Sequence, residues 1–236
     1  MIPFLLALLF SGPAAAGAFP APEAMGGFEG TLRSGYAFAS VMSPSVDKRV
    51  TPVARLTLNY LYYRFPDQGG EARVISPGLA FGVGASWRPD RLSLTLVAGY
   101  EARYVQTRPT TGAPVARADH GVSVSGDVYF QASSRVALAS SVSYGFAQNY
   151  LWARALAKRQ LFPVRGTAVT AFAMGLDGTV QGNEQARSVG GGLFGELSFP
   201  GARTALGLRV GLSREIQPGA SNALLPSLGG SIYKSF

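Results

Sequence analysis

The chain has 236 residues, of which 47% are hydrophobic and only 14% are charged, and glycine occurs 30 times. A soluble domain carries about 25% charged residues and about 7% glycine, so this composition argues against an ordinary cytosolic enzyme and fits strands between lipid and a narrow lumen. Cysteine is absent, which excludes disulfides, thiolate metal sites and a cysteine nucleophile. The net charge of +8 comes from basic residues that are dispersed along the chain without a cluster, a distribution that argues against nucleic-acid binding.

The N-terminus has the pattern of a signal peptide. An apolar run from Ile2 to Phe10 is followed by small residues with an Ala-x-Ala pattern at Ala14 and Ala16, or at Ala16 and Ala18. The run is far shorter than the roughly 20 residues of a membrane-spanning helix, and a buried N-terminal helix is the alternative interpretation. We therefore expect a signal peptide over residues 1–18 and one barrel domain over residues 19–236.

Apolar and polar residues alternate along almost all of the remaining chain. The clearest case is residues 91–105, where one face carries Leu92, Leu94, Leu96, Ala98, Tyr100, Ala102 and Tyr104. Alternate side chains of a strand point to opposite faces, and the opposite faces here are rich in Gly, Ser, Ala and Thr, as the interior of a small barrel requires. Eleven segments qualify: 28–42, 50–64, 72–87, 91–105, 119–132, 135–148, 150–162, 164–177, 186–199, 202–215 and 224–236.

This pattern predicts an all-β fold, an antiparallel transmembrane β-barrel in the outer membrane of a Gram-negative bacterium. Bacterial barrels have an even number of strands, so one of the eleven segments is misassigned; we expect about 12 strands, with 10 as the alternative. The least certain segments are 28–42 and 150–162. Short turns at residues 88–90, 133–134 and 200–201 are expected on the periplasmic side, and residues 107–118, 178–184 and 217–222 are expected as extracellular loops. The C-terminal Phe236, with Leu228 and Ile232 on the same face, resembles the terminal signal of outer-membrane proteins.

Few residues suggest catalysis. The single histidine, His120, is the best candidate for a hydrolase at the barrel rim, but Ser123 and Ser125 fall on the opposite face of the same strand. The match to Gly-x-Gly-x-x-Gly at residues 190–195 lies inside an alternating strand and lacks the helix that a dinucleotide site needs. We expect no catalytic residue, no metal site and no cofactor.

A sparse set of charged residues falls on the inward faces of the predicted strands. These residues are Arg33, Arg55, Glu101, Arg103, Asp127, Asp177, Glu196 and Arg209. They would form either a path for polar or anionic solutes or a salt-bridged network that fills a small barrel, and we favour the network because buried charges must be paired. Arginine and lysine at the rim are expected to meet outer-membrane lipid and lipopolysaccharide phosphates.

The second half of the chain resembles the cellulose biosynthesis protein BcsS family of small exported barrel proteins. The resemblance lies in the segments Gly99–Glu101, Tyr150–Phe162, Gly175–Asp177, Gly182–Asn183 and Arg187–Gly190, with Leu176 and Asp177 in place of a Pro and a Glu of the family pattern. It implies a role near exopolysaccharide production, with polysaccharide or cellulose synthase components as partners. The expected function is thus a non-enzymatic outer-membrane barrel associated with cellulose biosynthesis or export; the alternatives are a general porin or surface barrel and a rim hydrolase using His120.

Overall fold

The computed structural model describes residues 22–43, 50–163, 171–217 and 222–236, so the predicted signal peptide lies outside the described residues. The described chain is almost entirely β-strand, with one 3-10 turn at Pro200–Ala202. The strands are β1 (Glu23–Gly30), β2 (Ser34–Met42), β3 (Val50–Asp67), β4 (Gly70–Trp87), β5 (Leu92–Arg108), β6 (Val115–Gln131), β7 (Val136–Gly145), β8 (Tyr150–Pro163), β9 (Ala171–Gly182), β10 (Arg187–Phe199), β11 (Thr204–Ile216) and β12 (Ala223–Ser235).

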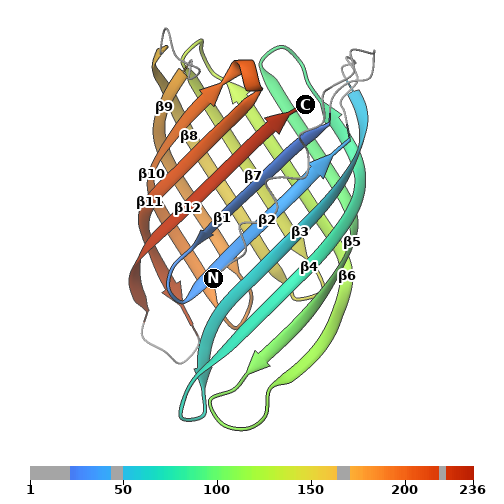
Figure 1. Cartoon of the computed structure of the whole chain (residues 1–236), viewed down its shortest axis with the longest axis vertical. Helices are drawn as coiled ribbons and strands as arrows, with labels where there is room; N and C mark the ends of the chain where they lie inside the picture. The colour runs from blue at the N-terminus through green and yellow to red at the C-terminus, as the bar shows by residue number, and fades with distance from the viewer. Residues whose placement is uncertain (1–21, 44–49, 164–170, 218–221) are drawn as a thin grey trace.

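These strands form one closed antiparallel barrel (Figure 1). Each strand pairs with its neighbours in the chain, and β1 closes the ring on β12, where Glu23 lies opposite Ser235. We call the end where β1 begins and β12 ends the terminal end; it lies at the top of Figure 1. The connections around residues 88–91, 132–135 and 200–203 also lie at this end. At the opposite end the hairpins β3–β4 and β5–β6 reach furthest, because these strands have 17 or 18 residues and the others have 8 to 14.

The prediction of twelve strands is confirmed, and the structure shows which segment had been misassigned. Residues 28–42 are not one strand, because a turn at residues 31–33 separates β1 from β2. The Thr31 hydroxyl accepts hydrogen bonds from the backbone N–H groups of Arg33 and Ser34, at 3.0 and 3.1 Å. A Cβ atom on Gly30 would lie 2.5 Å from the Ser34 carbonyl oxygen, so the chain reverses there only because residue 30 is glycine.

Two loop predictions need correction. The segment 178–184 is not a loop, since β9 continues to Gly182 and the connection to β10 is a tight turn in which Asn183 Oδ1 accepts the N–H groups of Gln185 and Ala186 at 3.0 and 3.1 Å. The predicted loop 107–118 is shorter, because β5 ends at Arg108 and β6 begins at Val115. In the predicted strand 164–177, β9 begins only at Ala171 and residues 164–170 lie outside the described residues.

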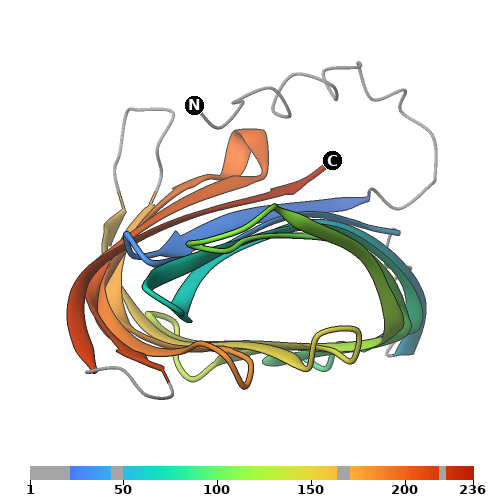
Figure 2. The same ribbon diagram turned by 90° about the horizontal axis from the view of Figure 1, so that it is seen from below.

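The outer wall of the barrel is apolar, as the alternation predicts. Side chains on the outer face are 47–60% exposed, for example Leu79, Phe81, Val83, Leu96, Tyr100, Tyr104, Leu208, Val210 and Leu212. Their neighbours in sequence point inward. The described part of the chain contains no helix with the length and apolar character needed to cross a membrane. Seen along its axis, the barrel is flattened, so β1–β3 and β7–β9 form two broad walls that face each other (Figure 2).

Candidate functional site

Aromatic side chains cross the barrel interior from wall to wall. Tyr36 and Phe38 of β2 meet Tyr150 and Trp152 of β8, although these strands lie on opposite sides of the twelve-strand ring. The Tyr36 ring centroid lies 6.2 Å from that of Tyr150 and 5.5 Å from that of Trp152. Leu61 of β3 packs against this group and is 0% exposed. We call these five residues the aromatic bridge; it joins the two broad walls across the lumen.

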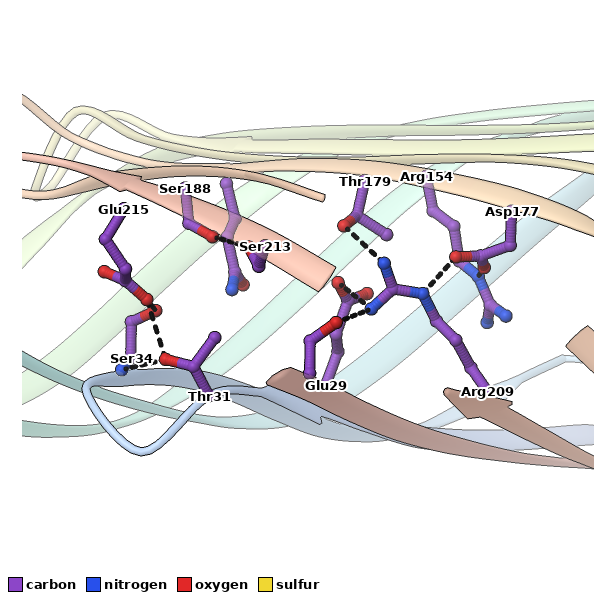
Figure 3. Close-up of polar contacts among 12 residues, drawn as sticks. Glu29, Thr31, Ser34, Arg154, Asp177, Thr179, Ser188, Arg209, Ser213 and Glu215 are labelled. Carbon is purple, nitrogen blue, oxygen red and sulfur yellow. Dashed lines mark hydrogen bonds and ion pairs between the residues drawn. The ribbon is translucent and has the colours of Figure 1, made fainter. Parts of the chain in front are cut away.

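Beside the aromatic bridge, charged residues of four strands meet around Arg209 of β11 (Figure 3). The Arg209 guanidinium pairs with Glu29 of β1, at 2.9 Å from Nη1 to Oε1, and with Asp177 of β9 through Nε. Asp177 also pairs with Arg154 of β8, at 2.5 Å from Oδ2 to Nε. Arg209 is 1% exposed. We call these four residues the Arg209 cluster; its paired charges satisfy the requirement that charge in a dry interior be compensated.

A second polar group lies between the Arg209 cluster and the end opposite the termini. Glu215 of β11 accepts hydrogen bonds from the hydroxyls of Thr31 and Ser34, at 2.7 and 2.6 Å (Figure 3). Glu215 is 2% exposed. The carboxylate thus holds the β1–β2 turn against a strand two places away in the ring. On the same side the hydroxyls of Ser188 and Ser213 lie 2.5 Å apart.

On the other side of the aromatic bridge, Arg103 and Glu101 of β5 form a buried ion pair. Glycine makes room for it: a Cβ atom on Gly145 of β7 would lie 2.8 Å from both carboxylate oxygens of Glu101. The Arg103 guanidinium also donates to the Ser76 carbonyl, at 3.3 Å. Lumen side chains from strands all around the ring are therefore packed against each other in this half of the barrel.

Toward the terminal end the lumen contains a buried apolar group, Met42, Val53 and Val97, and two ion pairs that are partly exposed. Arg55 of β3 pairs with Asp127 of β6 at 2.5 Å, and the Asp127 side chain is 30% exposed. Lys158 of β8 pairs with Glu196 of β10 at 2.5 Å, and its ammonium lies 6.0 Å from the ring centroid of Tyr129. Tyr129 points inward and is 40% exposed. The lumen near the termini thus combines buried side chains with partly exposed ion pairs.

The structure places most of the predicted inward charges in these groups. Seven point into the lumen: Arg55, Glu101, Arg103, Asp127, Asp177, Glu196 and Arg209. Arg33 does not, because it lies in the β1–β2 turn, where it pairs with Glu71 at 2.9 Å. The sequence-based set lacks four members of the network, Glu29, Arg154, Lys158 and Glu215. Of these, Glu215 was accessible to sequence reasoning, since it continues the inward face that carries Arg209 and Ser213.

The catalytic candidate His120 lies on the outer face of β6. Its ring stacks on Tyr100 of β5, with centroids 5.9 Å apart. Ser123 and Ser125 point to the lumen on the other face of the same strand, so the structure does not bring a hydroxyl nucleophile to this imidazole. Within the described residues, no group of three or more histidine, aspartate or glutamate side chains is arranged to hold a metal ion.

Comparisons with known proteins identify a family and solved structures to which this chain is similar. A family model described as cellulose biosynthesis protein BcsS matches residues 33–216. The beta domain of the Bordetella autotransporter BrkA is 14% identical, with a TM-score of 0.54 over 93% of this chain and 100% of that one. An outer membrane channel from Pseudomonas putida F1 is 11% identical, with a TM-score of 0.49 over 97% and 100% of the two chains. No curated protein sequence matches. The likeness to the BrkA domain shows the fold, that of an outer-membrane barrel.

Proposed function

Because the chain belongs to the cellulose biosynthesis protein BcsS family, we propose that it acts in cellulose production as a non-enzymatic, non-conducting barrel in the outer membrane of a Gram-negative bacterium. Cellulose or the cellulose synthase components are its expected partners. The family match and the outer-membrane barrel fold support the general role. The aromatic bridge, which crosses the lumen, supports a role as a scaffold rather than as a channel.

The physical argument for a scaffold is the packing of the lumen. An open pore leaves its inward side chains in water, as the polar, water-filled interior of porins does. Here Leu61 is 0% exposed, and Arg209 and Glu215 are 1% and 2% exposed, although all three face the lumen. For a glucan chain to pass, Tyr36 and Trp152 would have to separate and the buried ion pairs would have to break. Breaking a buried pair costs about 3–5 kcal/mol, which opposes spontaneous opening.

Single-channel recording in planar bilayers tests this proposal. The wild-type barrel should give no steady current. A Tyr36→Ala/Trp152→Ala variant, which removes the bridge from both walls, should give a measurable conductance. Tyr100→Ala and Tyr104→Ala, which remove outward aromatics of β5, are the matched controls and should leave the membrane sealed. Steady current through the wild-type protein would refute the scaffold and favour a channel or porin.

Genetic complementation tests the link to cellulose. Deletion of the gene should reduce cellulose output, and the wild-type gene should restore it. A His120→Ala variant should restore it equally, because the outer-face histidine has no hydrolytic task in this proposal. Normal cellulose output without the gene would refute the role, whereas failure of His120→Ala alone would point to the hydrolase alternative.

A further inference from the structure

Three arginines form a row across the outer wall at the end opposite the termini. Arg64 of β3 lies opposite Arg73 of β4, and Arg73 lies opposite Arg108 of β5. All three fall on the outer face, since they share the strand parity of the exposed Tyr60, Leu79 and Tyr104. Arg73 and Arg108 are exposed. Like charges directly opposite each other on neighbouring strands repel, so a row of this kind needs a counter-charge.

The described protein supplies only part of that counter-charge. Glu71 pairs with Arg64 at 3.8 Å and with Arg33 of the adjacent turn at 2.9 Å. Arg64 Nε also donates to the Tyr62 hydroxyl at 2.5 Å. One carboxylate therefore lies against four guanidinium groups, so the three arginines of the row, Arg33 and Glu71 together keep a net charge of +3.

A shallow apolar groove of about 440 Å³ lies on β4, β5 and β6, nearer the middle of the wall. Its outward side chains are Pro77, Leu79, Ala102, Tyr104, Ala118 and His120. The alanines leave a hollow between the larger side chains. Pro77 also interrupts the pairing of β4 with β5, which omits Ser76 and Pro77, because proline has no N–H to donate.

The spacing between row and groove suits one kind of ligand. Pro77 follows Arg73 by four residues, and Tyr104 precedes Arg108 by four, which is about 13 Å along a strand at about 3.3 Å per residue. A guanidinium binds a phosphate group by two parallel, charge-assisted hydrogen bonds. A ligand with a phosphorylated head and an acyl chain would place the phosphate at the arginines and the chain along the apolar wall into the groove.

We propose that Arg64, Arg73 and Arg108, together with this groove, form a binding site for lipopolysaccharide, with its phosphates on the arginines and one acyl chain in the groove. The assignment of this lipid rests on the proposed outer-membrane placement, in which the end opposite the termini faces outward. The ligand must be both anionic and acylated, because an anion alone would contact only the arginines and an acyl chain alone would contact only the groove.

Lipid binding to the purified full chain in neutral detergent tests the proposal. Native mass spectrometry would count bound lipopolysaccharide as its concentration is raised. The Arg73→Gln/Arg108→Gln variant should bind about tenfold more weakly or worse, as the loss of charged hydrogen bonds implies. The control Arg159→Gln/Arg214→Gln removes two outward arginines of β8 and β11 and should bind as the wild type does. Equal affinity of the two double variants would overturn the proposal.

Further ligands and variants test the two halves of the site. Deacylated lipopolysaccharide and inorganic phosphate should each bind far more weakly than the whole lipid. Ala102→Leu fills the groove and should weaken binding, whereas Ala98→Leu, outside the groove on the same strand, should not. Phosphatidylglycerol binding as tightly as lipopolysaccharide would refute the specific lipid. These outcomes are independent of cellulose output, so a failed binding test with the protein present in the outer-membrane fraction would refute only this site.

Discussion

Removal of the Arg209 guanidinium should destabilise the barrel more than any loss of an outward charge. In Arg209→Met, Asp177 keeps its pair with Arg154, at 2.5 Å. Glu29, whose side chain is 8% exposed, loses the ion pair that it makes at 2.9 Å. An uncompensated buried charge of this kind costs about 3–5 kcal/mol, so we expect that loss in the free energy of unfolding.

Urea unfolding of the folded protein in detergent or lipid vesicles measures this loss. The chain has two tryptophans, and the fluorescence of Trp152 in the aromatic bridge reports on lumen packing. The Arg209→Met/Glu29→Gln variant removes both charges and should be more stable than Arg209→Met alone, because the stranded carboxylate is gone. Arg214→Met, an outward change on the same strand, is the control. A loss below about 1 kcal/mol for Arg209→Met, or a double variant no better than the single one, would show that the pair is not the source of stability.

Three further changes probe other parts of the wall. Glu215→Ala removes the acceptor of two hydroxyls in the β1–β2 turn, which should cost about 1–3 kcal/mol and speed hydrogen exchange at residues 31–33; unchanged exchange would contradict this. Gly84→Ala would place a Cβ atom 1.8 Å from a backbone carbonyl oxygen of β5. It should therefore lower the free energy of unfolding, measured in urea, by about 1–3 kcal/mol. Gly178→Ala, whose Cβ would lie 3.9 Å from its nearest neighbour, is the control, and equal losses would count against the steric argument. Leu208→Arg on the lipid-facing wall should lower the free energy of unfolding in a bilayer by about 2–4 kcal/mol, and Leu224→Arg near the barrel end should lower it by about 0–1 kcal/mol. A larger loss for Leu224→Arg than for Leu208→Arg would contradict the assignment of this face to lipid.

The outer wall and the lumen of this barrel are stabilised by different interactions. The outer wall needs only apolar side chains of any shape, since lipid adapts to them. The lumen holds buried arginines, carboxylates and tyrosines, and several of them pair across strands, as Arg209 does with Glu29 and Asp177. The proposed scaffold role depends on this interior, and the proposed lipid site depends on a local departure from the apolar rule on β3, β4 and β5.

Much of the fold was predictable from sequence because alternation is a local signal. In β5, Leu96, Tyr100 and Tyr104 share the outer face while Glu101 and Arg103 share the inner face, and no knowledge of other strands is needed to see this. Repetition of the pattern along the chain predicts closure, since a lipid-facing sheet cannot leave an open edge. The inward position of Arg55, Asp177 and Glu196 follows from the same parity.

Other features needed the tertiary structure. The turn at residues 31–33 has no apolar signature, so Glu29 was hidden within a single predicted strand and Arg33 was placed on the wrong surface. In β8, alternating aromatic and basic residues left the inward face undecided until pairing with β7 and β9 settled it.

Sequence by itself determined that apolar and polar side chains alternate along each strand and which face of each strand meets lipid. This information is local, because successive side chains of a strand point to opposite faces. Only the tertiary structure decided that Tyr36 meets Trp152 across the lumen, that Arg209 joins Glu29 to Asp177, and that Arg64, Arg73 and Arg108 stand side by side. The physical reason is that these contacts depend on the register between strands and on the flattening of the ring, and both are properties of the closed barrel as a whole.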